Sequence, residues 1–137
     1  MSTPLEPSGS YNVDLLMQVR EKIVNEPERH FQGSWARAES DPREDGECGT
    51  AYCVAGWAAV LDGQELDWQL GDWGGWDADY LADGKGIWSY AQKALGLGAI
   101  ERAILFAGGN SRQRVLSMLD RLIEAGKNGE RIPEGEL

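Results

Sequence analysis

The stretch ECGTAYCVAGWAAVL, residues 47–61, decides the fold that the sequence predicts. Most residues in its second half are small, and Gly56 stands in the middle of the predicted helix. A glycine inside a helix costs about 1 kcal/mol relative to alanine, and close packing against another element is the natural compensation. We therefore expect a helix with Thr50 as its N-cap, Gly63 as its end, and a neighbouring element very close to Gly56.

The two cysteines of this stretch, Cys48 and Cys53, allow several interpretations. A structural zinc site needs about four ligands, usually nitrogen or sulfur atoms, and the chain adds only one histidine, His30. A nucleophilic thiol is favoured by the place of Cys53 in the first helical turn, with His30 as its base and Gln32 or an acid as the orienting group. A disulfide fits the short separation but not a reducing compartment.

Packing is the interpretation that we favour for these cysteines. A free cysteine behaves as a small buried hydrophobe, so Cys53, Gly56 and Trp57 would pack against the first or last helix. His30 would then be a hydrogen-bonded histidine that anchors a long loop. On this view the protein has no metal and no cofactor. The alternative is a small cysteine-dependent enzyme that uses Cys53 or Cys48 with His30.

Four other segments show the spacing of apolar residues, or the end signals, that are typical of helices. They are residues 12–26, 87–98, 99–109 and 110–126. Asn12 is the expected N-cap of the first, and Asn110 with Gln113 forms the expected capping box of the last, which Gly126 ends. No alternation with a period of two persists, so the sequence predicts an all-α fold, a compact bundle of about five helices.

The length of 137 residues predicts one domain. We expect a flexible tail at 1–10, a single helical domain at 11–126 and a polar C-terminal tail at 127–137. Within the domain, residues 27–47 are expected to form a long loop, because they are acidic and contain proline and glycine. Residues 62–86 form an acidic, tryptophan-rich insert.

The net charge of −10, from 23 acidic against 13 basic residues, argues against direct nucleic-acid binding through bulk charge. It favours partners with a basic surface. No apolar run approaches the roughly 18 residues that a membrane span needs, and no secretory signal is visible at the N-terminus. The sequence therefore predicts a cytoplasmic protein with no membrane association.

The insert DGQELDWQLGDWGGWDADYLADG is the most unusual stretch, because residues 62–83 hold seven acidic residues and no lysine or arginine. Tryptophan and tyrosine are enriched at interface hot spots, and acidic neighbours steer a protein toward Arg/Lys surfaces. The residues expected to bind are Trp68, Asp72, Trp73, Trp76, Asp77, Asp79 and Tyr80. The opposite interpretation, in which the indoles fold into the core and only the acids face water, is open as well.

The segment that begins at Asp77 resembles the start of a calcium-binding loop, with Asp77 and Asp79 at the first two ligand positions. The glycine that an EF-hand requires is replaced by Ala82, and Trp88 stands at the position of the bidentate glutamate. The pattern therefore excludes an EF-hand; an irregular site of oxygen ligands is the open alternative, and we expect no metal ligands there.

The motif C-G-T-x-x-C-x-A-G-W resembles that of an uncharacterised family of small proteins from actinobacteria and their phages, as do the upstream HFQGSW and the downstream ALGLGAIERAILFAGG. The resemblance covers roughly residues 13–61 and 90–125, and the insert has no counterpart in it. It singles out His30, Gln32, Trp35, Cys48, Gly49, Thr50, Cys53, Gly56 and Trp57. It implies a compact helical fold and a phage origin, and it implies no reaction.

Together these observations predict a non-enzymatic, phage-encoded interaction protein of the host cytoplasm. Its acidic, aromatic surface would bind a host protein that has a basic surface.

Overall fold

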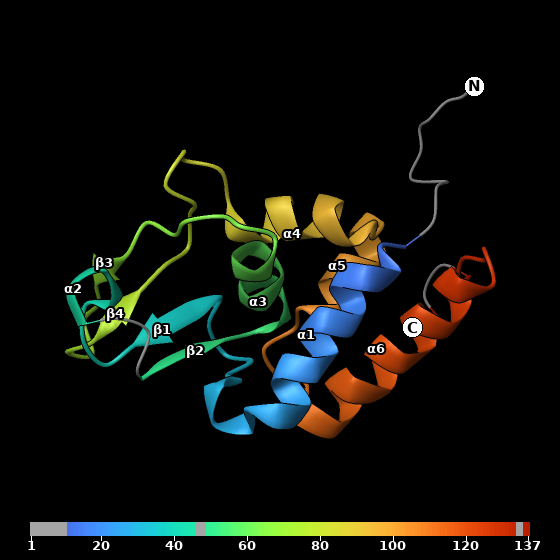
Figure 1. Cartoon of the computed structure of the whole chain (residues 1–137), viewed down its shortest axis with the longest axis horizontal. Helices are drawn as coiled ribbons and strands as arrows, with labels where there is room; N and C mark the ends of the chain where they lie inside the picture. The colour runs from blue at the N-terminus through green and yellow to red at the C-terminus, as the bar shows by residue number, and fades with distance from the viewer. Residues whose placement is uncertain (1–10, 46–48, 134–135) are drawn as a thin grey trace.

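The computed structural model of the chain describes residues 11–45, 49–133 and 136–137, and it combines helices with a sheet. A four-stranded antiparallel sheet lies at one end of the molecule with the short helix Pro42–Asp45 beside it, and the other five α-helices of the described residues make up the rest (Figure 1). The prediction of an all-α fold is therefore wrong. The predicted tail at 1–10 and Cys48 lie outside the described residues.

Most of the predicted helices are present. The α-helices are α1 (Val13–Asn25), α2 (Pro42–Asp45), α3 (Val54–Leu61), α4 (Ile87–Leu95), α5 (Ala99–Leu105) and α6 (Arg112–Lys127), and a 3-10 turn, η1, spans Pro27–Arg29. Asn12 caps α1 as predicted, since its side chain accepts a hydrogen bond from the backbone N–H of Leu15. Helix α1 packs against α3, α4 and α6, and α3 packs against α4, so the core lies between these helices. Among the described residues, no helix is both long and apolar enough to cross a membrane.

Both ends of the last predicted helix differ from expectation. Ser111, not Asn110, is the N-cap of α6, because the Ser111 hydroxyl accepts from the backbone N–H of Arg114. The helix also continues through Gly126 to Lys127. A glycine in the left-handed conformation follows only at Gly129, with φ of 70°. A glycine alone therefore does not end a helix that packing holds in place.

Three of the four strands come from the predicted loop and from the acidic insert, for which the sequence analysis expected no strands. Strand β1 (Ala36–Ala38) and helix α2 lie within the predicted loop 27–47. Strands β3 (Gln69–Leu70) and β4 (Trp76–Asp77) lie within the insert. The remaining strand is β2 (Thr50–Tyr52), and the strand order is β2-β1-β4-β3. The insert is thus tied to the loop by backbone pairing, and the two form one structural unit.

The register of the sheet sends alternate side chains of β1 to opposite faces. Ala36 and Ala38 are buried, whereas Arg37 lies on the outer face. There Arg37 is directly opposite Ala51 of β2 on one side and Asp77 of β4 on the other. Pairing with β4 therefore places an acidic residue of the insert beside a basic residue of the loop.

Helix α3 begins later than expected, because Thr50 belongs to β2 and Cys53 is the N-cap. The expected close approach to Gly56 is confirmed. The approaching group is the backbone of Trp35: a Cβ atom added to Gly56 would lie 1.9 Å from the Trp35 carbonyl oxygen. Trp57 is 2% exposed and stacks on Tyr52, with 4.7 Å between ring centroids. Residues 49–57 of the motif thus form the junction between the sheet and α3.

Candidate functional site

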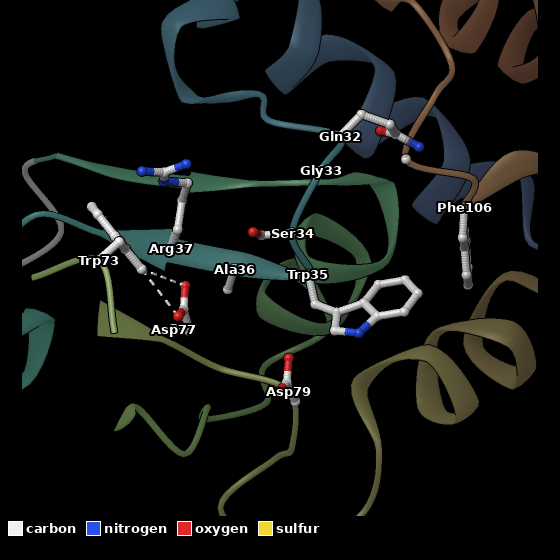
Figure 2. Close-up of a pocket in the computed structure, with 11 residues that line it drawn as sticks. Gln32, Gly33, Ser34, Trp35, Ala36, Arg37, Trp73, Asp77, Asp79 and Phe106 are labelled. Atoms are coloured by element: carbon white, nitrogen blue, oxygen red, sulfur yellow. Dashed lines mark hydrogen bonds between the residues drawn. The ribbon is translucent and has the colours of Figure 1, made fainter. Parts of the chain in front are cut away.

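A cleft of about 520 Å³ lies at the outer face of β1, where four parts of the chain meet (Figure 2). Its walls come from the segment before β1, from β1 itself, from the insert and from the turn after α5. The lining residues are Gln32, Gly33, Ser34, Trp35, Ala36, Arg37, Trp73, Asp77, Asp79, Phe106 and Gly108. The cleft combines aromatic rings with one guanidinium and two carboxylates, and it is the strongest candidate site among the described residues.

Trp73 forms the rim of the cleft and is held in one orientation although its side chain is 44% exposed. Its indole N–H donates to both carboxylate oxygens of Asp77, at 3.1 and 3.0 Å. One edge of the ring lies against glycine backbone. An added Cβ on Gly75 would come within 2.1 Å of the ring, and one on Gly71 would come within 2.9 Å of its nitrogen. The glycines therefore leave room for the indole on the turn between β3 and β4.

Arg37 holds the indole from another direction. Its guanidinium carbon lies 4.1 Å from the Trp73 ring centroid and 4.5 Å from that of Phe31, so the cation is placed between two rings. Contacts of this kind contribute about 0.5–1 kcal/mol each at exposed sites. The resulting cluster of Phe31, Arg37, Trp73 and Asp77 fixes one wall of the cleft before any ligand arrives.

Asp79 supplies the second carboxylate, and its side chain is exposed. Figure 2 shows the carboxylates of Asp77 and Asp79 both directed toward β1. Asp77 is engaged by the Trp73 indole, whereas no other residue of the described chain donates a hydrogen bond to the side chain of Asp79. Asp79 is therefore the carboxylate of the cleft with free hydrogen-bonding capacity, and it is an acceptor, whereas the ring contacts of Arg37 leave its N–H groups able to donate.

The other residues expected to bind are placed differently. Trp68 is only 6% exposed and stacks near Tyr52 in the core, so its indole is not available at the surface. Trp76 is half-buried, with the guanidinium of Arg43 5.4 Å from its ring centroid. Asp72 and Tyr80 are exposed but do not line the cleft. The insert therefore divides into a core indole, a partly covered indole and one indole presented at the cleft.

His30 and Gln32 form a buried network behind the cleft. The Gln32 amide nitrogen donates to the carbonyl oxygens of Leu105 and Ala107, at 2.9 and 3.3 Å. Its oxygen is then the acceptor for His30 Nε2–H at 2.9 Å. His30 Nδ1, left as an acceptor, receives a hydrogen bond from Arg112 Nε at 3.4 Å. The expectation of a hydrogen-bonded histidine that anchors the long loop is confirmed.

This network predicts a stability that depends on the protonation of His30. Burial lowers the pKa of His30, and the nearby Arg112 guanidinium lowers it further. At a pH between the lowered pKa of the folded state and the ordinary value of 6.5, the unfolded chain binds a proton on His30 that the folded chain does not. The contribution of neutral His30 to the free energy of unfolding is therefore complete above pH 6.5 and is lost as the pH falls below that value. We expect urea denaturation to show a falling free energy of unfolding from pH 7 to pH 5.

The matched variant for this prediction is His30→Gln, which has no titrating group. It should be less stable than the wild type at pH 8 but should lose the slope between pH 7 and pH 5. Hydrogen bonds to Lys22 and Arg43 lower the pKa values of Glu26 and Asp41 respectively. The stability that these carboxylates contribute is lost only as the pH falls below their ordinary pKa values of 4.5 and 3.8, so they do not produce a slope between pH 7 and pH 5. A variant that keeps the wild-type slope above pH 5 would contradict the assignment.

Cys53 is a buried, free thiol, as the packing interpretation expected. Its sulfur donates to the Trp35 carbonyl oxygen at 3.8 Å. Burial raises the pKa of Cys53 to about 11, so the thiol stays protonated at neutral pH. Both ring nitrogens of His30 are engaged by Gln32 and Arg112, so the imidazole is not placed to take a proton from this sulfur.

Two further expectations about ligands concern metals and Cys48. Cys48 lies outside the described residues. Its roles as a zinc ligand, a disulfide partner or a nucleophile therefore stay predictions from the sequence. In the part of the chain that the structure describes, no group of three or more His, Cys, Asp and Glu side chains is arranged to hold a metal ion.

No protein-family model matches the chain, and neither does any curated protein or any solved structure. The resemblance to small actinobacterial and phage proteins, carried by the C-G-T-x-x-C-x-A-G-W motif, therefore stays a prediction. The site has to be interpreted from its own geometry.

Proposed function

We propose that this protein binds a segment of another protein in the cleft between β1, the insert and the end of α5. The observation that carries the proposal is the Trp73 indole, which is 44% exposed and yet held by Arg37, Asp77 and the glycine backbone beside it. A rigid, partly exposed aromatic ring loses little conformational entropy when a partner covers it. Such rings dominate the binding energy of protein interfaces.

The chemistry of the cleft favours a partner segment that carries a positive charge. Asp79 offers an unsatisfied carboxylate beside the aromatic rings of Trp35 and Trp73. A lysine or arginine side chain can satisfy both groups at once, with its charge on the carboxylate and its stem on the rings. The surrounding charge of −10 would steer a basic surface toward the cleft. A cytoplasmic host protein as the partner and a phage origin are further parts of the proposal, and they rest on the sequence alone.

The test compares capture of a partner by the wild type and by Trp73→Ala. The protein is immobilised, exposed to cell lysate, and any captured protein is then purified and its affinity measured by calorimetry. A hot-spot residue contributes about 2 kcal/mol or more, so Trp73→Ala should weaken binding about 30-fold. Because the ring lies outside the core, circular dichroism melting should show little loss of stability.

Met17→Ala is the matched control. Met17 is 45% exposed on α1 and does not line the cleft, so its removal should leave the affinity unchanged. Equal capture by wild type and Trp73→Ala, or loss of binding in Met17→Ala instead, would refute the proposal.

A further inference from the structure

A smaller, apolar notch adjoins the cleft and shares two of its walls. Its volume is about 280 Å³, and its lining residues are Trp35, Trp88, Arg102, Ala103, Phe106 and Ala107. Trp35 and Phe106 also line the cleft. Their rings pack edge to face with centroids 6.0 Å apart, so this single aromatic pair separates the two cavities.

The notch differs from the cleft in its chemistry. No carboxylate lines it, and its one charged residue, Arg102, lies with its guanidinium carbon 4.6 Å from the centroid of the Trp88 ring. Trp88 is 40% exposed, which is unusual for so large an apolar side chain. The remaining walls are the methyl groups of Ala103 and Ala107 and the shared aromatic pair. These walls suit an apolar side chain, and they offer a cation no carboxylate, while Arg102 already occupies the Trp88 ring.

We infer that the partner segment binds in an extended conformation across both cavities, with a lysine or arginine in the cleft and an apolar side chain two residues away in the notch. This inference rests on the proposed function. In an extended chain, side chains two residues apart point to the same face and lie about 6.7 Å from each other. The cleft and the notch share Trp35 and Phe106 as walls, so one layer of aromatic side chains lies between them, and a step of two residues along an extended chain can cross it.

The experiment titrates the full chain with short capped peptides, followed by amide NMR shifts and tryptophan fluorescence. The complete probes are acetyl-Gly-Lys-Gly-Leu-Gly-amide and its reversed order, since the walls do not fix the direction of the chain. The partial probes replace either the lysine or the leucine with glycine. The better complete probe should bind about tenfold more tightly than the lysine-only peptide, because the leucine leaves water for an apolar site.

Two variants separate the cavities. Ala103→Leu fills the notch and should remove the tenfold gain from leucine while binding of the lysine-only peptide stays the same. Asp79→Asn should weaken every lysine peptide and leave the gain from leucine intact. Ala99→Leu is the control for the first variant, since Ala99 is also exposed on α5 but does not line the notch.

The outcomes distinguish this inference from the proposed function. If lysine peptides bind in the cleft but leucine adds nothing, or if Ala103→Leu keeps the gain, the two-cavity inference is wrong and the proposed function stands. If no lysine peptide shifts the resonances of Trp73 and Asp79, both are wrong.

Discussion

Replacing Gly56 with alanine is expected to lower the free energy of unfolding by about 3 kcal/mol or more, the upper end of the cost of overpacking. The new Cβ would lie 1.9 Å from the carbonyl oxygen of Trp35, whereas real Cβ atoms essentially never come closer than 3.0 Å to such an atom. The obstacle is backbone, so no side-chain rotation relieves it. Helix α3 and the start of β1 would have to move apart by about 1 Å, and protein interiors are too closely packed to absorb that movement.

The gain in helix propensity does not offset this cost. Alanine is favoured over glycine in a helix by about 1 kcal/mol, which is well below the expected penalty. The movement would also lengthen the hydrogen bond from the Cys53 thiol to the same carbonyl group, which is already 3.8 Å. For a chain of this size, a loss of about 3 kcal/mol lowers the melting temperature by roughly 10 °C.

Gly109→Ala is the control for the Gly56 variant. Its added Cβ would have no heavy atom within 4 Å, so the same chemical change should leave the melting temperature unchanged or slightly raised. Thermal and urea unfolding of both variants measure the difference. A Gly56→Ala protein within 1 kcal/mol of the wild type would show that the close contact between α3 and the Trp35 backbone is not a feature of the folded chain.

The helices were predictable because their signals are local. The apolar stripe of α1, its cap at Asn12 and the glycine that follows α4 at Gly96 each lie within the helix that they mark or directly beside it. Gly56 could be interpreted for the same reason, since a glycine in a helix of small residues indicates a close neighbour. The identity of that neighbour could not be predicted, because Trp35 is distant in sequence and approaches through its backbone.

The sheet was missed because its strands contain only two or three residues each. Alternation of polar and apolar residues cannot be recognised over so short a length. One signal was available in the insert, where the glycines at 71, 74 and 75 lie between the short strands β3 and β4. A loop of three to five residues with glycine is typical of a hairpin.

The cleft was half predictable. Trp73, Asp77 and Asp79 stood out in the sequence because acids and indoles are concentrated in the insert. Arg37 and Phe31 did not, because nothing local marks a residue whose partner is brought to it by strand pairing. The backbone pairing of β1 with β4 is what sets Arg37 opposite Asp77.

The second large effect is expected at Glu101, which is a buried carboxylate. It is 6% exposed and accepts hydrogen bonds from the Tyr11 hydroxyl, from Arg131 at 2.8 Å and from the backbone N–H of Gly98 at 2.8 Å. Burial, and then the hydrogen bond to Glu101, raise the pKa of Tyr11. The Tyr11 hydroxyl in turn accepts from the backbone N–H of Ile132, at 2.9 Å. This carboxylate therefore joins the start of α1, the start of α5 and the segment after α6.

Glu101→Ala should lower the free energy of unfolding by about 3 kcal/mol, the low end of the cost of removing one partner of a buried ion pair. The low end applies because the Arg131 side chain is 27% exposed and can still reach water. Glu101→Gln keeps an acceptor for the Gly98 N–H and should cost about half as much, since it loses the charge and the acceptor that faces the Tyr11 hydroxyl but not the whole polar group. Urea denaturation at pH 7 measures both variants.

A double-mutant cycle separates the ion pair from the other roles of Glu101. The cycle compares the loss of unfolding free energy in the double variant Glu101→Ala/Arg131→Met with the sum of the losses in the two single variants. If the pair with Arg131 carries much of the effect, the loss in the double variant should be smaller than that sum by about 1 kcal/mol or more. Glu21→Ala is the control, because Glu21 is exposed on α1 and makes no ion pair with another described residue, so it should change stability by less than about 0.5 kcal/mol. A Glu101→Ala protein as stable as Glu21→Ala would mean that water, and not this carboxylate, satisfies Tyr11 and Arg131. In that case the chain after α6 would be held to the domain by its other contacts, such as the hydrogen bonds from Arg131 to the Gly96 carbonyl oxygen and from the Ile132 N–H to the Tyr11 hydroxyl.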